Sequence, residues 1–274
     1  MNEVANLAGN GPAAAPKYKV SMVPVISLDT EKQLSIRDIR NEPSIRGAMY
    51  TDHVIGVNEH LSWLNQLKQT TQQLAMAVLN KDGIPVGLAS LKNIDPLHKT
   101  ADWGAYISEG ARGIGIGTIA AIGMIDQAFH VLALEKLNAE VIEGNAPSLN
   151  YHKKIGFVEE GFRKSNVVKQ GKRLGVHLLG LEKANWERQR AQIVKNSRLI
   201  VDESTVRVQQ PPADLQASLS PIDRIEAARA RNNLNWMSIL RIALERSPDT
   251  SKQIVSEIKK IDQEISALTQ ELIE

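Results

Sequence analysis

Apolar positions along residues 20–195 follow two periods, the two-residue alternation of strands and the longer repeat of helices. Short apolar runs predict strands over residues 20–28, 74–79, 84–91, 103–108, 137–142, 157–169 and 174–181. Longer runs predict helices that begin after Asp29 or Thr30 and near Asn58, and that cover residues 119–132, 148–154 and 184–195. Turn residues 80–83 and 170–172 are typical of hairpins between neighbouring strands.

The order of these elements predicts an α+β fold. Strand 103–108, helix 119–132 and strand 137–142 form one βαβ unit, and the right-handed crossover rule makes its two strands parallel. Hairpins on both sides make the other neighbouring strands antiparallel. We therefore expect a mixed, mostly antiparallel sheet with one central parallel pair and flanking helices. This arrangement differs from the repeated βαβ units of a doubly wound nucleotide-binding fold.

Composition narrows the class of protein. Hydrophobic residues make up 42% of the chain and charged residues 23%, which is ordinary for a globular protein. The net charge of +2 gives no footprint for nucleic acid, and no run of about 18 apolar residues suggests a membrane span. The absence of cysteine excludes disulfides, thiolate metal sites and a cysteine nucleophile. We expect a cytoplasmic protein with no nucleic-acid or membrane partner and no metal.

The two ends of the chain differ from its centre. Residues 1–16 are rich in Ala, Gly, Asn and Pro and predict a disordered leader, which leaves residues 17–196 as the main domain. Residues 197–219 are of mixed polarity with two adjacent prolines and predict a linker. Residues 220–274 predict a helical hairpin, and its second helix has apolar residues spaced alternately four and three apart. We expect the apolar positions of this hairpin to pack either within the hairpin or against another subunit. The module would then mediate interaction or homo-oligomerisation.

A glycine-rich segment, residues 110–117, joins strand 103–108 to helix 119–132. Such a turn exposes backbone N–H groups at a helix N-terminus, where the macrodipole favours negative charge. The segment therefore predicts a cradle for a pyrophosphate. It lacks the Gly-Lys-Ser/Thr of a P-loop, and its glycine spacing does not match the dinucleotide fingerprint. A plain tight turn with glycines for close packing is the remaining alternative.

Two segments resemble signatures of the GCN5-related N-acetyltransferase (GNAT) family. Arg112-x-x-Gly115-x-Gly117 resembles its acetyl-CoA signature, and residues 145–157 resemble its second signature at the expected separation. The resemblance covers residues 19–188. Within the family the chain is most similar to the enzymes of pseudaminic acid biosynthesis that N-acetylate a UDP-linked 4-amino-4,6-dideoxy sugar, through residues 39–46, 59–63 and 148–152. Ribosomal-protein N-terminal acetyltransferases share a version of this layout.

The resemblance implies a site for acetyl-CoA as co-substrate. Backbone amides of the glycine turn would hold the pyrophosphate, and the backbone near Tyr106 and Ile107 would pair with the pantetheine arm where the parallel strands splay. Asn145 and Ser148 would contact the co-substrate or only cap a helix. The implied co-substrate residues are Arg112, Gly113, Ile114, Gly115, Ile116, Gly117, Thr118, Tyr106, Ile107, Asn145 and Ser148.

The chemistry needs a base for the amine and a proton donor for the departing thiolate. His152 occupies the position where many family members carry a proton-donating tyrosine, a role that requires a raised pKa or relay through water. Tyr151, one place away, ranks second, and both residues have a structural alternative. Glu143 shares a strand face with Asn145 and is a candidate base, as are Glu59 and His60, or a base acting through bound water.

The leading hypothesis, which follows from the resemblance, is acetyl transfer to the 4-amino group of a UDP-linked amino-deoxy sugar. Such a sugar would serve a surface glycan or flagellin glycosylation. Arg40, Arg46 and His60 would meet the nucleotide diphosphate, with surface salt bridging as the alternative for each arginine. Transfer to protein N-termini is the second hypothesis. A third hypothesis, from another class, is a scaffold that acts mainly through its C-terminal coiled coil.

Overall fold

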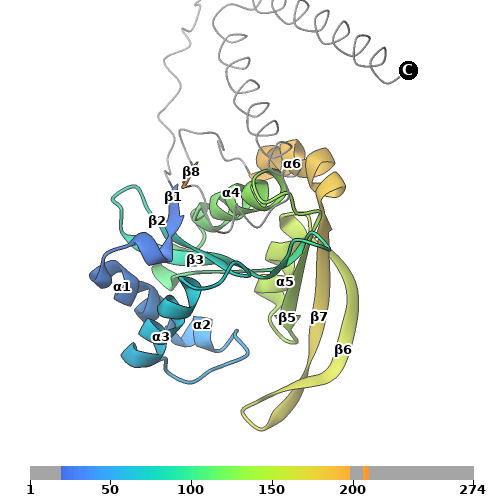
Figure 1. Ribbon diagram of the computed structural model, residues 1–274. Helices are drawn as coiled ribbons and strands as arrows, with labels where there is room; N and C mark the ends of the chain where they lie inside the picture. The colour runs from blue at the N-terminus through green and yellow to red at the C-terminus, as the bar shows by residue number, and fades with distance from the viewer. Residues whose placement is uncertain (1–19, 198–205, 210–274) are drawn as a thin grey trace, which may run out of the picture. The chain divides into compact units, whose positions relative to one another are not determined.

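The computed structural model describes residues 20–197 and 206–209 (Figure 1). The strands are β1 (Val20–Pro24), β2 (Leu74–Leu79), β3 (Pro85–Asp95), β4 (Thr100–Ile107), β5 (Lys136–Ile142), β6 (Val158–Lys169), β7 (Lys172–Glu182) and β8 (Val206–Val208). The helices are α1 (Thr30–Arg40), α2 (Pro43–Arg46), α3 (Val57–Leu67), α4 (Ile116–His130), α5 (Ala146–Lys154) and α6 (Lys183–Ser197). The elements expected within residues 20–195 are found in the expected order, except that the first strand ends at Pro24 and not at residue 28, because Val25–Ser27 turn in a single 3-10 turn. Asp29 caps α1 by accepting from the Lys32 N–H.

The eight strands form one sheet in the order β6-β7-β5-β4-β3-β2-β1-β8. The predicted parallel pairing of β4 with β5 is confirmed, and β1 to β7 are otherwise joined by antiparallel pairs. The β4–β5 pairing covers only residues 100–102 and 136–138. Beyond this point the two strands splay, which opens the sheet at the carboxyl end of β5.

Helices cover both faces of the sheet (Figure 1). One hydrophobic cluster packs α4 and α6 against the sheet, and α4 is buried along most of its length because its sequence is apolar nearly all round. A second cluster packs α1 and α3 against the other face. On α3 the buried side chains are His60, Leu64 and Leu67, whereas Leu61 is 37% exposed.

Two elements were not anticipated. The four-residue helix α2 is too short for a periodic signal, and the three-residue strand β8 lies within the expected linker. β8 pairs in parallel with β1, so part of this segment belongs to the sheet. The expected leader, most of the linker and the helical hairpin at residues 220–274 lie outside the described residues. Over the part of the chain that is described, no helix has the length and apolarity to cross a membrane.

Candidate acetyl-CoA site and acceptor pocket

The glycine turn takes a backbone path that favours glycine at two positions. Gly113 has φ +78° and Gly115 has φ +93°, and Gly115 is the N-cap of α4 without a side-chain cap. The first intrahelical bond runs from Ile119 N–H to the Gly115 carbonyl. The three N–H groups before it, on Ile116, Gly117 and Thr118, have no intrahelical acceptor and point out of the helix end. The geometry is therefore that of an anion cradle.

Arg112 is held beside this turn. Its Nε donates to the Ile107 carbonyl at 2.9 Å and its Nη2 donates to Ser44 Oγ at 3.1 Å. The Glu42 carboxylate accepts from the Glu109 N–H at 2.8 Å. Glu42 is the N-cap of α2 and Ser44 lies within that helix, so these bonds attach the segment around the glycine turn directly to α2.

Tyr106 and Ile107 lie in the splayed part of β4, where its backbone pairs with β3 but not with β5. The β5-facing edge of this segment can therefore accept an extended ligand in the manner of an added strand. Burial raises the pKa of the Tyr106 phenol, so it stays protonated. Ile107 also lies 3.3 Å from where a Cβ on Gly117 would be, so a larger residue at Gly117 would crowd it.

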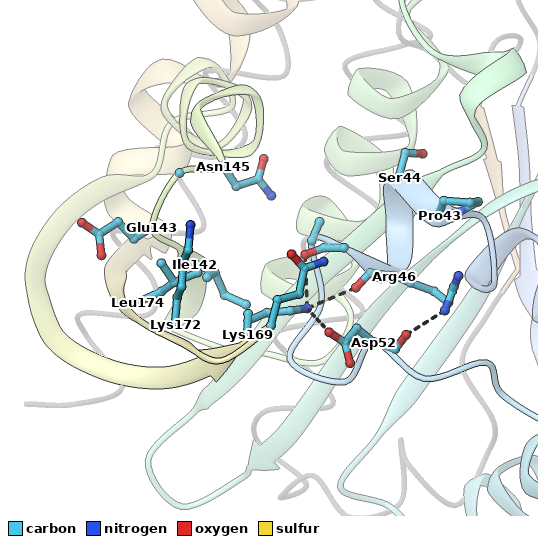
Figure 2. Close-up of a pocket in the computed structure, with 14 residues that line it drawn as sticks. Pro43, Ser44, Arg46, Asp52, Ile142, Glu143, Asn145, Lys169, Lys172 and Leu174 are labelled. Carbon is cyan, nitrogen blue, oxygen red and sulfur yellow. Dashed lines mark hydrogen bonds and ion pairs between the residues drawn. The ribbon is translucent and has the colours of Figure 1, made fainter.

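Helix α5 connects the two sides of the site. Asn145 caps α5, its Oδ1 accepting from the Ser148 N–H at 3.2 Å, which is the structural alternative considered for it. In Figure 2 the Asn145 side chain points toward the α2 side of the pocket. Tyr151 donates its hydroxyl to the Gly117 carbonyl at 2.8 Å, and burial raises its pKa. Tyr151 therefore contacts the glycine turn and keeps its proton.

His152 does not meet the condition set for a proton donor. It is buried, its Nδ1 lies 2.8 Å from the Ser148 carbonyl, and its ring packs edge-on against Phe157. Burial lowers its pKa, which outweighs the opposing effect of the Ser148 carbonyl. A direct proton transfer from His152 at neutral pH is therefore disfavoured, and its observed contacts are those of a core residue.

Glu143, the candidate base, lies immediately after β5. Its carboxylate accepts from the Gly175 N–H at 2.7 Å, and Figure 2 shows it turned away from α2. Glu59, the other carboxylate considered, pairs with His53 at 2.9 Å. Glu143 lines the pocket described below, whereas Glu59 does not.

The three residues expected to meet the acceptor are not brought together. His60 is buried between helices, its Nε2 2.8 Å from the Gln33 carbonyl, so it serves helix packing rather than a ligand. Arg40 donates to the Thr51 carbonyl and hydroxyl at 3.0 and 3.1 Å, and its Nη1 is buried without a hydrogen-bond partner among the described residues. Only Arg46 lines the pocket.

That pocket has a volume of about 620 Å³, and none of residues 110–117 is among the residues that line it. Its walls are α2 with the following loop, the turn between β5 and α5, and the end of the β6–β7 hairpin. Figure 2 shows Arg46, Asp52 and Lys169 converging on one wall. Ser44 and Asn145 also line it, and the Ser44–Arg112 bond links it to the turn.

Sequence reasoning missed the loop at residues 47–56 that forms part of this pocket. Neighbouring and distant side chains hold it at several points: Arg46 binds the Asp52 carbonyl at 2.8 Å, Lys169 binds the Met49 carbonyl, and Tyr50 donates to Glu140. No periodic signal marks such a loop, since its order comes from contacts up to 122 residues away. Among the described residues, no three His, Asp or Glu side chains converge to hold a metal ion.

Acidification is expected to destabilise the domain below about pH 6.5, because burial lowers the folded-state pKa of both His60 and His152 below the unfolded value near 6.5. The unfolded chain then binds more protons, so stability is highest above about pH 6.5 and falls as the pH drops toward the folded pKa values. Thermal midpoints at pH 5 to 8 measure this. The double variant His60→Gln/His152→Gln should show a shallower slope, with His130, whose pKa burial also lowers, left in place. An unchanged slope would contradict the assignment.

Comparison with known proteins identifies the domain. Residues 24–158 match the acetyltransferase (GNAT) domain family. This domain belongs to the GNAT family. The sheet with its splayed parallel pair is the GNAT fold, and the expected class is confirmed. The spermidine N-acetyltransferase from Vibrio cholerae, solved with CoA and spermine, shares the fold with a TM-score of 0.58 at 18% identity, over 62% of this chain and 98% of that one.

Two curated relatives are similar over a shorter stretch. YdaF of Bacillus subtilis, provisionally named as a ribosomal N-acetyltransferase, is 32% identical over 106 residues, which are 39% of this chain and 58% of that protein. The spermidine N(1)-acetyltransferase of Escherichia coli K12 is 36% identical over 84 residues, 31% of this chain and 45% of that protein. The chain thus spans about half the length of these curated relatives.

Proposed function

We propose that the chain is an acetyl-CoA-dependent N-acetyltransferase. The observation that carries the proposal is the adjacency of three features: the glycine cradle, the unpaired edge of β4 and the pocket that Ser44 joins to the cradle. The cradle fits a pyrophosphate, and the open edge fits an amide-containing arm. The family of the domain and the CoA-bound neighbour support the same co-substrate.

The co-substrate supplies a thioester, and the acceptor amine attacks it directly and displaces the CoA thiolate; the absence of a cysteine that could carry the acetyl group agrees with this direct transfer. The residues contribute by positioning the two reactants. Tyr151, protonated and bonded to the Gly117 carbonyl, is the candidate proton donor beside the cradle. Glu143 lies at the pocket, and its carboxylate would reach the amine through water.

For the acceptor we propose an amine carried on an anionic molecule, with the UDP-linked amino-deoxy sugar as the leading candidate. Arg46, Lys169 and Lys172 line the pocket against Asp52 and Glu143, which favours an anion over a polycation such as spermidine. The resemblance of residues 39–46 to the pseudaminic acid enzymes supports the same class. The similarity to YdaF favours a second candidate, the N-terminus of a ribosomal protein.

A CoA-release assay separates these acceptors. Purified full-length chain with acetyl-CoA should release CoA fastest with a UDP-4-amino-4,6-dideoxy sugar, and at least about tenfold more slowly with spermidine or an N-terminal peptide, a difference of about 1.4 kcal/mol. Faster turnover of the peptide would instead support the second candidate, the N-terminus of a ribosomal protein. Absence of CoA release with all three amines, in protein that binds acetyl-CoA, would contradict the proposed activity.

We further propose that residues 220–274 mediate assembly of the chain in the cytoplasm, as their four-three apolar spacing suggests. A truncation after Gln209 keeps β8, which pairs with β1. Light scattering of the truncated and full-length chains tests this proposal, and the same number of subunits per particle in both would contradict it.

A further inference from the structure

Lys169 is a buried lysine in the wall of the pocket. It ends β6, and its side chain is only 9% exposed. Its Nζ donates to the carbonyl oxygens of Arg46 and Gly47 at 3.3 and 3.2 Å and to that of Met49, and it lies 3.7 Å from the Asp52 carboxylate. We call these four oxygen-bearing groups the oxygen cage. In Figure 2, dashed lines join the Lys169 nitrogen to Arg46 and Asp52.

The hydrogen bonds of Lys169 use all its donors. A lysine ammonium has three N–H groups and no acceptor, and the three carbonyls of the cage take all three. Lys169 therefore has no donor left for a molecule in the pocket. Lys172, which lines the same pocket, is exposed and has no side-chain partner among the described residues. The two lysines thus have different roles, since only Lys172 is available to an anionic acceptor.

The cage itself has the chemistry of a site for a cation. Three carbonyl oxygens directed at one point, with a carboxylate beside them, attract an ammonium and leave buried acceptors unpaired when it is removed. With Lys169 in place the cage is neutralised and filled. A second ammonium, brought by an acceptor, finds no subsite there.

We propose that Lys169 determines acceptor specificity by occupying an ammonium site that would otherwise accept a polyamine. This inference rests on the proposed function, in which the pocket holds the acceptor. The ammonium of Lys169 neutralises the oxygen cage, so this wall of the pocket does not attract a polycation. The remaining cations that line the pocket, Arg46 and Lys172, favour an anion. Emptying the cage opens a subsite for one ammonium of spermidine, while another amine of the same molecule faces the acetyl donor.

The test uses the full-length chain and the variant Lys169→Ala, which removes the equivalent of one propylammonium ion. Its thermal midpoint is measured in propylammonium chloride and in sodium chloride at equal ionic strength. Propylammonium should raise the midpoint of Lys169→Ala and leave that of the unaltered chain unchanged. Lys169→Met, which fills the space without charge, and Lys172→Ala, which leaves the cage occupied, should not respond. In the CoA-release assay, kcat/KM for spermidine should rise at least about tenfold in Lys169→Ala.

Several outcomes would overturn the proposal. One is an equal effect of the two salts on Lys169→Ala, and another is an equal propylammonium response in Lys172→Ala. An unchanged spermidine kcat/KM in a folded Lys169→Ala that still turns over its normal acceptor removes the specificity role. If Lys169→Ala is insoluble in sodium chloride, recovery of soluble protein in propylammonium supports the cage and failure in both salts overturns it. A midpoint response without turnover of any amine supports the ammonium site and counts instead against the proposed function.

Discussion

Replacement of Gly115 by valine is expected to weaken acetyl-CoA binding by at least about 100-fold, or about 2.7 kcal/mol, while the domain stays folded. Gly115 has φ +93° at the N-cap of α4, a region that a β-branched residue adopts only with strain of about 1–2 kcal/mol or more. Relief of this strain rotates the first turn and misdirects the N–H groups of Ile116 and Gly117. Calorimetric titration with acetyl-CoA measures the loss.

A matched control separates strain from binding. Gly83, in the turn between β2 and β3, has φ +74°, and a Cβ added there would meet no atom within 4 Å, so Gly83→Val carries similar backbone strain away from the cradle. It should lower the thermal midpoint as Gly115→Val does, yet bind acetyl-CoA normally. Normal acetyl-CoA binding by Gly115→Val would show that the turn is not the pyrophosphate site.

The fold could be predicted where its determinants are local. Turn residues 80–83 follow β2 and close the hairpin to β3. β4, the glycine turn, α4 and β5 follow one another as a βαβ unit, and the crossover in such a unit is right-handed. β8 could not be predicted in the same way. Its three residues form a strand because they pair with β1, which is far away in the sequence. No periodic signal in the sequence distinguishes them from a linker.

Most of the candidate donor half could be located from the sequence because it lies in one continuous segment, residues 106–118. The acceptor half could not, since its pocket is assembled from three separate segments and one wall depends on Lys169. Tyr151 and His152 are adjacent in sequence, yet α5 directs one toward α4 and buries the other against Phe157. The sequence signature places a residue on the helix, and only the packing determines which of the two neighbours reaches the glycine turn.

Replacement of Arg46 by alanine is expected to raise the KM for the acceptor about 30-fold or more, with little change in acetyl-CoA affinity. Arg46 donates from Nε to the Asn41 carbonyl at 3.0 Å and from Nη1 to the Asp52 carbonyl at 2.8 Å, so it holds the loop that forms one wall of the pocket. Hydrogen bonds from a charged donor contribute about 1.5–3 kcal/mol each. Their loss frees the wall and removes a cation that faces the acceptor. Steady-state kinetics with each substrate varied in turn measures both effects.

Two further variants make the Arg46 result specific. Arg46→Lys keeps the positive charge but cannot reproduce the two-directional bonding of a guanidinium, so it should recover only part of the acceptor affinity. Arg37, whose guanidinium pairs with the adjacent Asp38 on α1, does not line the pocket, and Arg37→Ala should leave both KM values unchanged. Full recovery by lysine would mean that charge alone matters at this position. An equal loss in Arg37→Ala would mean that the acceptor effect comes from general destabilisation, and the pocket would lose its assignment.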